Sequence, residues 1–233
     1  MIMPNWASNK VTISGDLEII TEIKNQLSQP YPNPFANEPS LLGEREPMVE
    51  GVFLLWNIVR PDNLDTYTEK DKKAFEEIVK SNKLDEPTFA GIATKLDEFQ
   101  KSLQDGSWFV ELQDQMATGQ GWYEWNCRNW GTKWELTGPE NYLEYELPSP
   151  DGLEITYRLM SAWSPPFEAL GKLAEQYPEV TISLTSIDEN DIFAMSAEWQ
   201  GGKELIADDI EITHEIGMDL RGYCNLECCN DYE

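Results

Sequence analysis

The stretch KVTISGDLEIITEIKNQL, residues 10–27, decides the fold. Its first six residues, 10–15, alternate apolar and polar side chains, which predicts a β-strand. Asp16 follows at a position that favours a helix N-cap. Beyond it, apolar residues recur at the spacing of one helix face, at Leu17, Ile20, Ile23 and Leu27. We therefore expect a strand that leads directly into an amphipathic helix.

The second half of the chain carries the same two patterns. The segments predicted as strands are 132–136, 153–160, 180–184 and 193–199, with a last strand at Ile210 and Ile212. A turn is expected at 188–191. Ser164 is the predicted N-cap of a second helix, because Pro165 then takes the first helical position, where proline is favoured. The predicted buried face of this helix consists of Phe167, Leu170, Leu173 and Tyr177.

In chain order these predictions give strand, helix, strand, strand, helix and strand, followed by one added strand. This order is the split β-α-β arrangement of ferredoxin-like folds, an α+β sandwich. We therefore predict a ferredoxin-like core formed by residues 1–29 and 106–215. Residues 30–105 are an insertion in this core, and residues 216–233 are a polar tail that contains cysteines.

The insertion begins with a proline-rich loop. Five prolines between residues 30 and 47 exclude regular structure, so this loop either wraps the surface or reaches a partner. The apolar run 52–59 is expected to be buried as a strand or a helix. Helical spacing over 68–80 and 88–103 then predicts an inserted helical hairpin.

The overall charge excludes several classes of protein. The 233 residues include 43 Asp and Glu against 17 Lys and Arg, a net charge of −26. Phosphate binding over a broad surface needs Lys and Arg, so direct nucleic-acid binding is not expected. No apolar run approaches the ~20 residues of a membrane span, and the N-terminus lacks the features of a signal peptide. We expect a cytoplasmic protein that does not bind membranes.

The sequence contains no clear catalytic or metal-binding motif. His214 is the sole histidine, and nothing places it beside a nucleophile, so we expect it on the surface. Cys224, Cys228 and Cys229 lack the second spaced pair of a zinc site, so reduced thiols are favoured over a bound metal. No glycine-rich phosphate loop is complete. We predict no enzyme activity, no catalytic residues, no metal and no cofactor.

Tryptophan is abundant in the middle of the chain. Trp122, Trp125 and Trp130 have spacings that place them on one helical face, and Gly131 is expected to end that helix. One interpretation is an aromatic platform that stacks on a base or a peptide. The alternative, which we favour, is that these side chains pack the sheet against its helices. The full set comprises Trp122, Trp125, Trp130, Trp134 and Trp163.

The acidic residues are concentrated in the second half. Residues 106–233 hold 25 acidic and 6 basic residues, a net charge of −19. The densest clusters, a candidate partner-binding surface, consist of Asp188, Glu189, Asp191, Asp208, Asp209 and Glu211. A folded surface with this charge attracts basic patches over long range, and a row of carboxylates can compete for a DNA-binding cleft. The alternative is a solvated acidic face that only aids solubility.

Three segments together resemble a known family. They are MPNWASN at 3–9, which leads into the first strand; NWGTKW at 129–134; and SAWSPP at 161–166, whose following helix ends at Tyr177 and Pro178. In this order they are similar to bacteriophage and plasmid proteins with a YubB-type ferredoxin-like domain. The resemblance implies a mobile genetic element and a ferredoxin-like fold, but no known reaction.

Three hypotheses for function follow. The first is an accessory protein of a phage or mobile element that binds and inhibits a host protein, a nucleic-acid-handling defence factor with a basic surface, through a DNA-mimicking acidic face. The second is a non-catalytic assembly module that associates through the helical hairpin at 66–105 and the proline-rich loop. The third is a small-molecule or nucleotide binder, or an enzyme, that uses the tryptophan cluster.

Overall fold

The computed structural model describes residues 5–37, 45–68, 121–150 and 152–226. The chain divides into two compact units. The first, which we call the sheet unit, comprises Met1–Pro32, Met48–Arg60 and Asn126–Glu233, and the second comprises Asn33–Pro47 and Pro61–Trp125. The predicted helical hairpin at 66–105, apart from residues 66–68, lies outside the described residues, as do Cys228 and Cys229.

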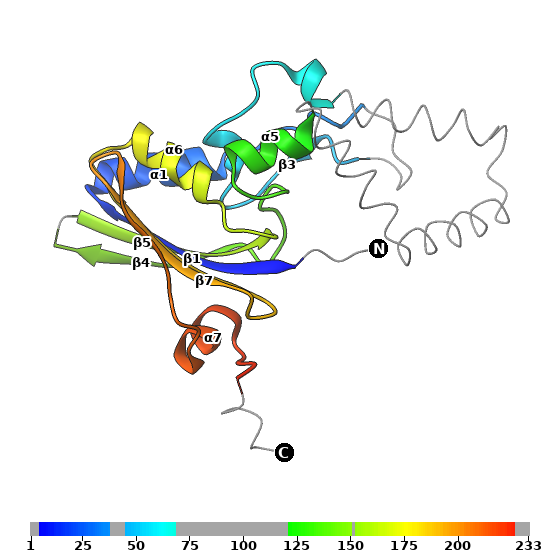
Figure 1. The fold of residues 1–233 in the computed structure, drawn as a ribbon. Coiled ribbons are helices and arrows are strands. Elements are labelled where there is room, and N and C mark those ends of the chain that lie inside the picture. Colours follow the sequence, from blue (N-terminus) through cyan, green and yellow to red (C-terminus); the bar gives the residue numbers. More distant parts are fainter. Residues whose placement is uncertain (1–4, 38–44, 69–120, 151, 227–233) are drawn as a thin grey trace, which may run out of the picture. The chain divides into compact units, whose positions relative to one another are not determined.

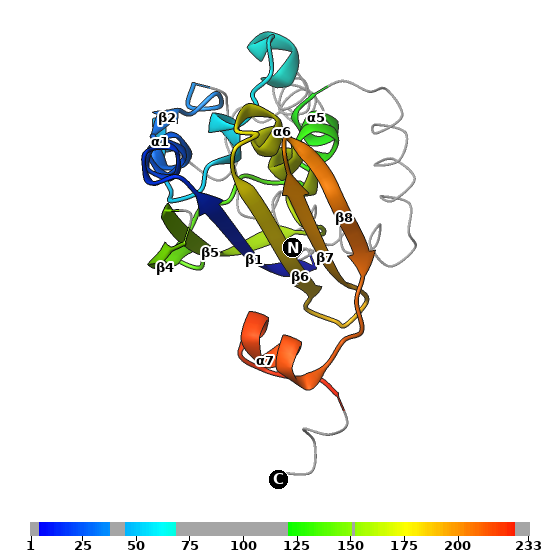
Figure 2. The same cartoon turned by 90° about the vertical axis from the view of Figure 1, so that its left-hand side faces the viewer.

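A six-stranded antiparallel sheet forms the centre of the sheet unit (Figures 1 and 2). Its strand order is β4-β5-β1-β6-β7-β8. The central strand β1 pairs with β5 along ten residue pairs and with β6 on its other side. The bounds are Trp6–Gly15 for β1, Tyr142–Ser149 for β4, Gly152–Ala162 for β5, Thr181–Asp188 for β6, Ala194–Gln200 for β7 and Lys203–Asp209 for β8. The predicted α+β class is confirmed.

Two helices, α1 (Leu17–Ser28) and α6 (Phe167–Gln176), cover one face of this sheet (Figure 1). The predicted cap of α1 is confirmed, since the Asp16 carboxylate accepts a hydrogen bond from the Glu18 N–H. Each fully buried aliphatic side chain in the layer between helices and sheet contributes about 1.5–3 kcal/mol. These side chains include Val11, Ile13, Ile20, Ile23, Leu27, Ile155, Leu159, Leu170, Leu173, Ile182 and Leu184.

The loop after α1 is buried against the same layer. Tyr31–Pro32 (β2) pairs with Met48–Val49 (β3), and the 3-10 helix η1 covers Leu55–Asn57. The prediction that the run 52–59 is buried is confirmed, although it forms a loop and η1 rather than a strand or an α-helix. Phe53 is fully buried, and its ring meets the Tyr157 ring edge-on, with the ring centres 5.0 Å apart.

A short helix, α7 (His214–Arg221), lies on the opposite face of the sheet (Figures 1 and 2). The sequence analysis placed residues 216–233 in a polar tail, and that expectation is wrong for this helix. Local interactions define both ends of this helix. The Thr213 hydroxyl caps the first turn by accepting a hydrogen bond from the Ile216 N–H, and Gly222 ends the helix at φ +78°.

Two predicted strands are misplaced. Residues 132–136 form no strand, because Thr132 donates its hydroxyl to the Ala162 carbonyl and Glu135 turns inward; β4 pairs with β5 instead. The last strand is β8, not Ile210 and Ile212. Gly201 and Gly202 both have positive φ, so they form a two-residue hairpin turn and β8 begins at once after it.

The predicted cap of α6 is also wrong. Pro166 precedes the helix without a side-chain hydrogen bond, whereas the Ser164 hydroxyl donates to the Gly131 carbonyl. Pro165 and Pro166 shift the first helical residue to Phe167. The predicted buried face is confirmed at Leu170 and Leu173, while Phe167 and Tyr177 are half-buried.

Candidate functional site

Asp188 does not belong to an exposed acidic surface. Only 2% of it is exposed, and its carboxylate accepts hydrogen bonds from the Asn190 and Ile192 N–H groups and from the Asn5 amide. These contacts make Asp188 the organiser of the predicted turn at 188–191. Its inclusion among the partner-binding residues is therefore corrected, because a buried, bonded carboxylate cannot meet a partner.

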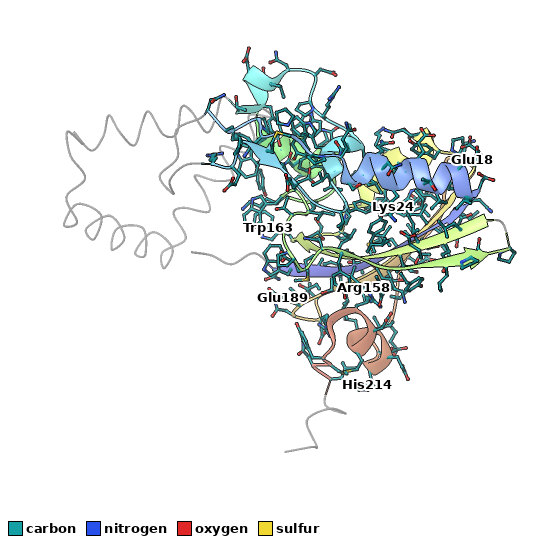
Figure 3. The ribbon with its side chains drawn as sticks, turned by 180° about the vertical axis from the view of Figure 1, so that it is seen from behind. Glu18, Lys24, Arg158, Trp163, Glu189 and His214 are labelled. Carbon is teal, nitrogen blue, oxygen red and sulfur yellow. The ribbon has the colours of Figure 1, made fainter. Side chains whose placement is uncertain are left out.

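Asp191 is also engaged within the fold. It lies at φ +57°, and its carboxylate forms an ion pair with the buried Arg221 guanidinium at 2.7 Å. Arg221 donates further to the Asp188 carbonyl. Glu189 is half-buried, and its N–H donates to the Trp6 carbonyl. Figure 3 shows Glu189 at the same end of the sheet as Trp163. The turn is thus a junction between the sheet and α7.

The remaining acidic candidates are exposed. Asp208 and Asp209 end the outer strand β8, and Glu211 follows two residues later. Glu204 on the same strand is exposed as well. Within the described ranges, no ion pair joins these four carboxylates to a basic residue. We call Glu204, Asp208, Asp209 and Glu211 the acidic edge.

Two tryptophan rings lie against Lys133, and a third packs on one of them. The Lys133 ammonium lies 4.4 Å from the centre of the Trp163 ring and 4.8 Å from that of the Trp134 ring. Trp6 meets Trp134 with ring centres 6.0 Å apart. The two contacts of the Lys133 ammonium are cation–π interactions, and they hold the Trp134 and Trp163 rings in place. Because Trp134 is 37% and Trp163 36% exposed, this Lys133 cluster keeps aromatic surface in contact with solvent.

Burial changes the chemistry of this lysine. Desolvation lowers the pKa of Lys133, and the charge of the nearby Cys127 opposes that shift. Cys127 is half-buried and lies on α5 (Trp122–Asn129). The sequence analysis did not single out Lys133; its position between aromatic residues was the available signal.

The segments 3–9, 129–134 and 161–166, which the sequence analysis singled out, meet at this cluster. Trp163 has φ +75°, uncommon for a residue with a side chain, and its N–H donates to the Asn5 carbonyl at 2.7 Å. The Lys133 N–H and the Thr132 hydroxyl both donate to the Ala162 carbonyl. Segments from the N-terminus and from the second half of the chain therefore assemble one structural site.

The other predicted platform residues make different contacts. Trp130 is 1% exposed, and its indole N–H donates to the Val59 carbonyl. Trp130 is therefore part of the core, which is the alternative that the sequence analysis favoured. Trp122 and Trp125 belong to the second unit, where Trp122 meets Tyr123 and Trp125 meets Tyr67 edge-on. Of the five tryptophans, the structure brings together Trp134 and Trp163.

A buried carboxylate that the sequence analysis missed lies next to the cluster in the chain. Glu135 accepts hydrogen bonds from the Leu55 and Trp56 N–H groups at 2.6 and 2.9 Å. The Leu136 N–H and the Tyr31 hydroxyl complete four donors. Desolvation raises the pKa of Glu135, against the effect of these hydrogen bonds. No sequence motif marks it, because a single Glu between apolar residues has no fixed meaning.

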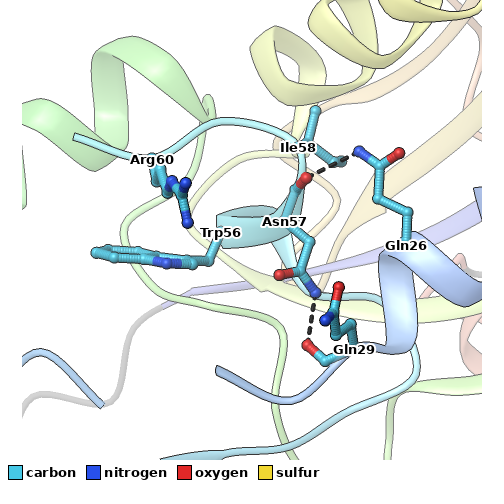
Figure 4. Close-up of a pocket in the computed structure, with 6 residues that line it drawn as sticks. All are labelled: Gln26, Gln29, Trp56, Asn57, Ile58 and Arg60. Carbon is cyan, nitrogen blue, oxygen red and sulfur yellow. Dashed lines mark hydrogen bonds between the residues drawn. The ribbon is translucent and has the colours of Figure 1, made fainter. Parts of the chain in front are cut away.

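The sheet unit also has one small polar pocket, of about 280 Å³, shown in Figure 4. Its amides bond to the surrounding backbone: Gln26 donates to the Asn57 carbonyl and Asn57 donates to the Gln29 carbonyl. The side-chain amides of Gln26 and Asn57 are therefore engaged within the fold. Its lining consists of Gln26, Gln29, Trp56, Asn57, Ile58 and Arg60.

His214 is exposed at the start of α7, as predicted. Among the residues that the structure describes, no group of three or more His, Cys, Asp or Glu is arranged to hold a metal ion. Nor does that part of the chain contain a helix long and apolar enough to cross a membrane.

Comparison with known proteins gives one structural similarity. No family model and no curated protein matches this chain. The crystal structure of protein api92 from Yersinia pseudotuberculosis, with family model DUF1281, is similar with a TM-score of 0.43 and 9% identity. The similarity covers 91% of this chain and 99% of that one. At this level it carries no argument about function.

Proposed function

We propose that this protein binds a basic partner protein through the acidic edge. The observation that carries the proposal is the unequal distribution of ion pairs. The basic residues Lys10, Lys24, Arg158, Lys172 and Arg221 all pair with other carboxylates. The acidic edge, in contrast, stays exposed and uncompensated within the described residues. Uncompensated charge on a folded surface attracts basic patches over long range.

The proposed partner is a nucleic-acid-handling defence protein of a bacterial host, and the proposed effect is inhibition. Asp208, Asp209 and Glu211 lie within four consecutive residues, so their charge density suits a cleft built for phosphates. The resemblance to phage and plasmid proteins supports the mobile-element origin. In this proposal the protein acts in the cytoplasm by occupying its partner and needs no catalysis.

We further infer that the core is ferredoxin-like. The support is the strand order β4-β5-β1-β6 combined with the chain order strand, helix, strand, strand, helix, strand. In this interpretation β7 and β8 extend the sheet beyond the common core. That extension carries the acidic edge.

The test is capture of binding proteins from a bacterial host lysate with the tagged full chain. The variant Asp208→Lys, Asp209→Lys, Glu211→Lys is expected to lose the captured protein. A control with the same change in net charge, Glu140→Lys, Glu168→Lys, Glu175→Lys, alters three exposed carboxylates elsewhere and is expected to retain it. Equal capture by both variants would contradict the proposal and favour the assembly module.

A second candidate function rests on the Lys133 cluster. Two half-exposed indoles held beside one ammonium can stack on a planar anion such as a nucleotide. Titration with ATP should then quench tryptophan fluorescence in a saturable way. Trp163→Leu should remove the quenching, and a signal unchanged by ATP would discard this candidate.

A further inference from the structure

The outer strand β8 presents an open sheet edge. It pairs with β7, and within the described residues no strand lies on its other side. All seven of its residues are exposed, including Leu205 at 63% and Ile206 at 47%. The outward backbone groups of an edge strand are unpaired, so such an edge can accept a further strand.

The opposite edge of the sheet is protected in the usual ways. Strand β4 contains Pro148, which has no N–H to donate, and its pairing with β5 shifts register between Leu143 and Tyr145. Strand β8 contains no proline, although its own pairing with β7 also shifts register, between Glu198 and Trp199. The difference between the edges is therefore Pro148: β8 keeps every backbone N–H as a donor, and β4 does not.

We propose that β8 binds an extended basic segment of the partner protein as a seventh, antiparallel strand. This inference rests on the proposed function, because it gives the mode by which the acidic edge is recognised. Main-chain hydrogen bonds supply affinity in strand addition, and side chains supply specificity. The antiparallel direction follows from the sheet, in which every described pairing is antiparallel.

Charge selects the occupant of this edge. In an antiparallel pair with a second copy of β8, centred on Ile206, Glu204 of each copy would face Asp208 of the other, and like charges on paired strands are destabilising. A basic segment places opposite charges there instead. The edge therefore favours a basic partner over self-association.

The order of side chains along β8 predicts the sequence of the segment. In the pairing of β8 with β7, Asp208 lies opposite Ser196 and Asp209 lies opposite Met195. Adjacent residues of a strand point to opposite faces of the sheet. An antiparallel segment therefore needs two consecutive basic residues, then a small residue opposite Ala207. The segment continues with two apolar residues, opposite Ile206 and Leu205. It ends with a basic residue opposite Glu204.

The test uses the peptide TKKTVVKT with the full-length protein. Its matched control carries the same side chains but is N-methylated at alternate backbone nitrogens on one edge, which blocks ladder hydrogen bonds and keeps the charge. We expect the parent peptide to bind and to slow hydrogen exchange in Lys203–Asp209. The methylated peptide should bind about tenfold more weakly or worse. Asp208→Lys, Asp209→Lys should also weaken binding of the parent peptide.

Each other outcome separates the two proposals. Equal binding of both peptides, weakened by salt, overturns strand addition and leaves recognition by charge intact. Binding of neither peptide, while the lysate experiment still captures a partner, likewise overturns strand addition alone. Both proposals are contradicted if two results occur together: the lysate experiment captures no partner, and the Asp208→Lys, Asp209→Lys variant binds the peptide as well as the natural protein does.

Discussion

At the scale of single residues, Glu135 and Lys133 determine how the loop from Trp130 to Leu136 meets the rest of the sheet unit. Glu135 binds two N–H groups at η1, and Lys133 joins two tryptophans that arrive from different segments. Neither interaction depends on helix or strand periodicity. Both are expected to be sensitive to changes of a few atoms.

The first prediction concerns Glu135→Gln. Each oxygen of the Glu135 carboxylate accepts hydrogen bonds from two donors. The glutamine amide keeps one of these oxygens and replaces the other with an NH₂ group, so two donors lose their acceptor. We expect the free energy of unfolding to fall by about 1–3 kcal/mol, measured by urea denaturation. The exposed Glu140→Gln serves as control. A loss at Glu135 no larger than that of the control would show that the four hydrogen bonds are not important for stability.

The second prediction concerns Lys133→Met, which keeps the apolar stem and removes the ammonium. Loss of two cation–π contacts should destabilise the fold by about 1 kcal/mol and shift the tryptophan emission spectrum. Lys203→Met, on exposed β8, is the control and should leave the spectrum unchanged. Identical spectra for the two variants would contradict the geometry of the Lys133 cluster.

At the scale of elements, α7 is held to the sheet by charge. Arg158 on β5 donates to the carboxylate and the carbonyl of Asp219, and Lys10 on β1 donates to the same carboxylate. Figure 3 shows Arg158 on the side of the sheet that faces α7. Burial opposes ionisation of Asp219, but these hydrogen bonds and charges outweigh it and lower its pKa.

The third prediction follows from that lowered pKa. A carboxyl group with a lower pKa in the folded state stabilises the fold at a pH above its unfolded value, and this stabilisation is lost as the pH falls through the folded value. The protection factors of the His214–Arg221 amides, which compare their hydrogen exchange with the intrinsic rate at the same pH, should therefore fall at a pH below about 4. Asp219→Asn should lower these protection factors already at neutral pH, at a cost of about 1 kcal/mol for half-exposed pairs.

The control for this prediction is Glu215→Gln, an exposed residue in the first turn of α7. It should leave exchange in the helix nearly unchanged at neutral pH. If Asp219→Asn behaved like this control, the contacts with Arg158 and Lys10 would not be what holds α7.

The sequence predicted the elements whose pattern is strong and local. The alternation of β1 and the helical spacing of α1 were sufficient, because one face of each is buried. Strand β4 was missed because it is a mostly exposed edge strand, and α7 because its eight residues include one buried residue. In the candidate site, Asp188 was misassigned because a carboxylate that organises a turn looks the same in sequence as one that faces solvent.

At the scale of the whole molecule, the net charge of −26 shapes both stability and binding. The fourth prediction is that salt stabilises this fold. Repulsion among 43 acidic residues is screened as ionic strength rises, so the Tm should increase between low and moderate NaCl. The Asp208→Lys, Asp209→Lys, Glu211→Lys variant should show a smaller increase. A Tm that is constant or falls with salt would mean that repulsion does not limit stability.

The measurement that tests the acidic edge most directly is capture from a bacterial host lysate at two salt concentrations, read by mass spectrometry. Between about 0.05 M and about 0.5 M NaCl the screening length falls from roughly 14 Å to roughly 4 Å. We predict that a nucleic-acid-handling protein with a basic surface is retained at the low concentration and lost at the high one. Retention of the same partner at both concentrations would contradict recognition by charge.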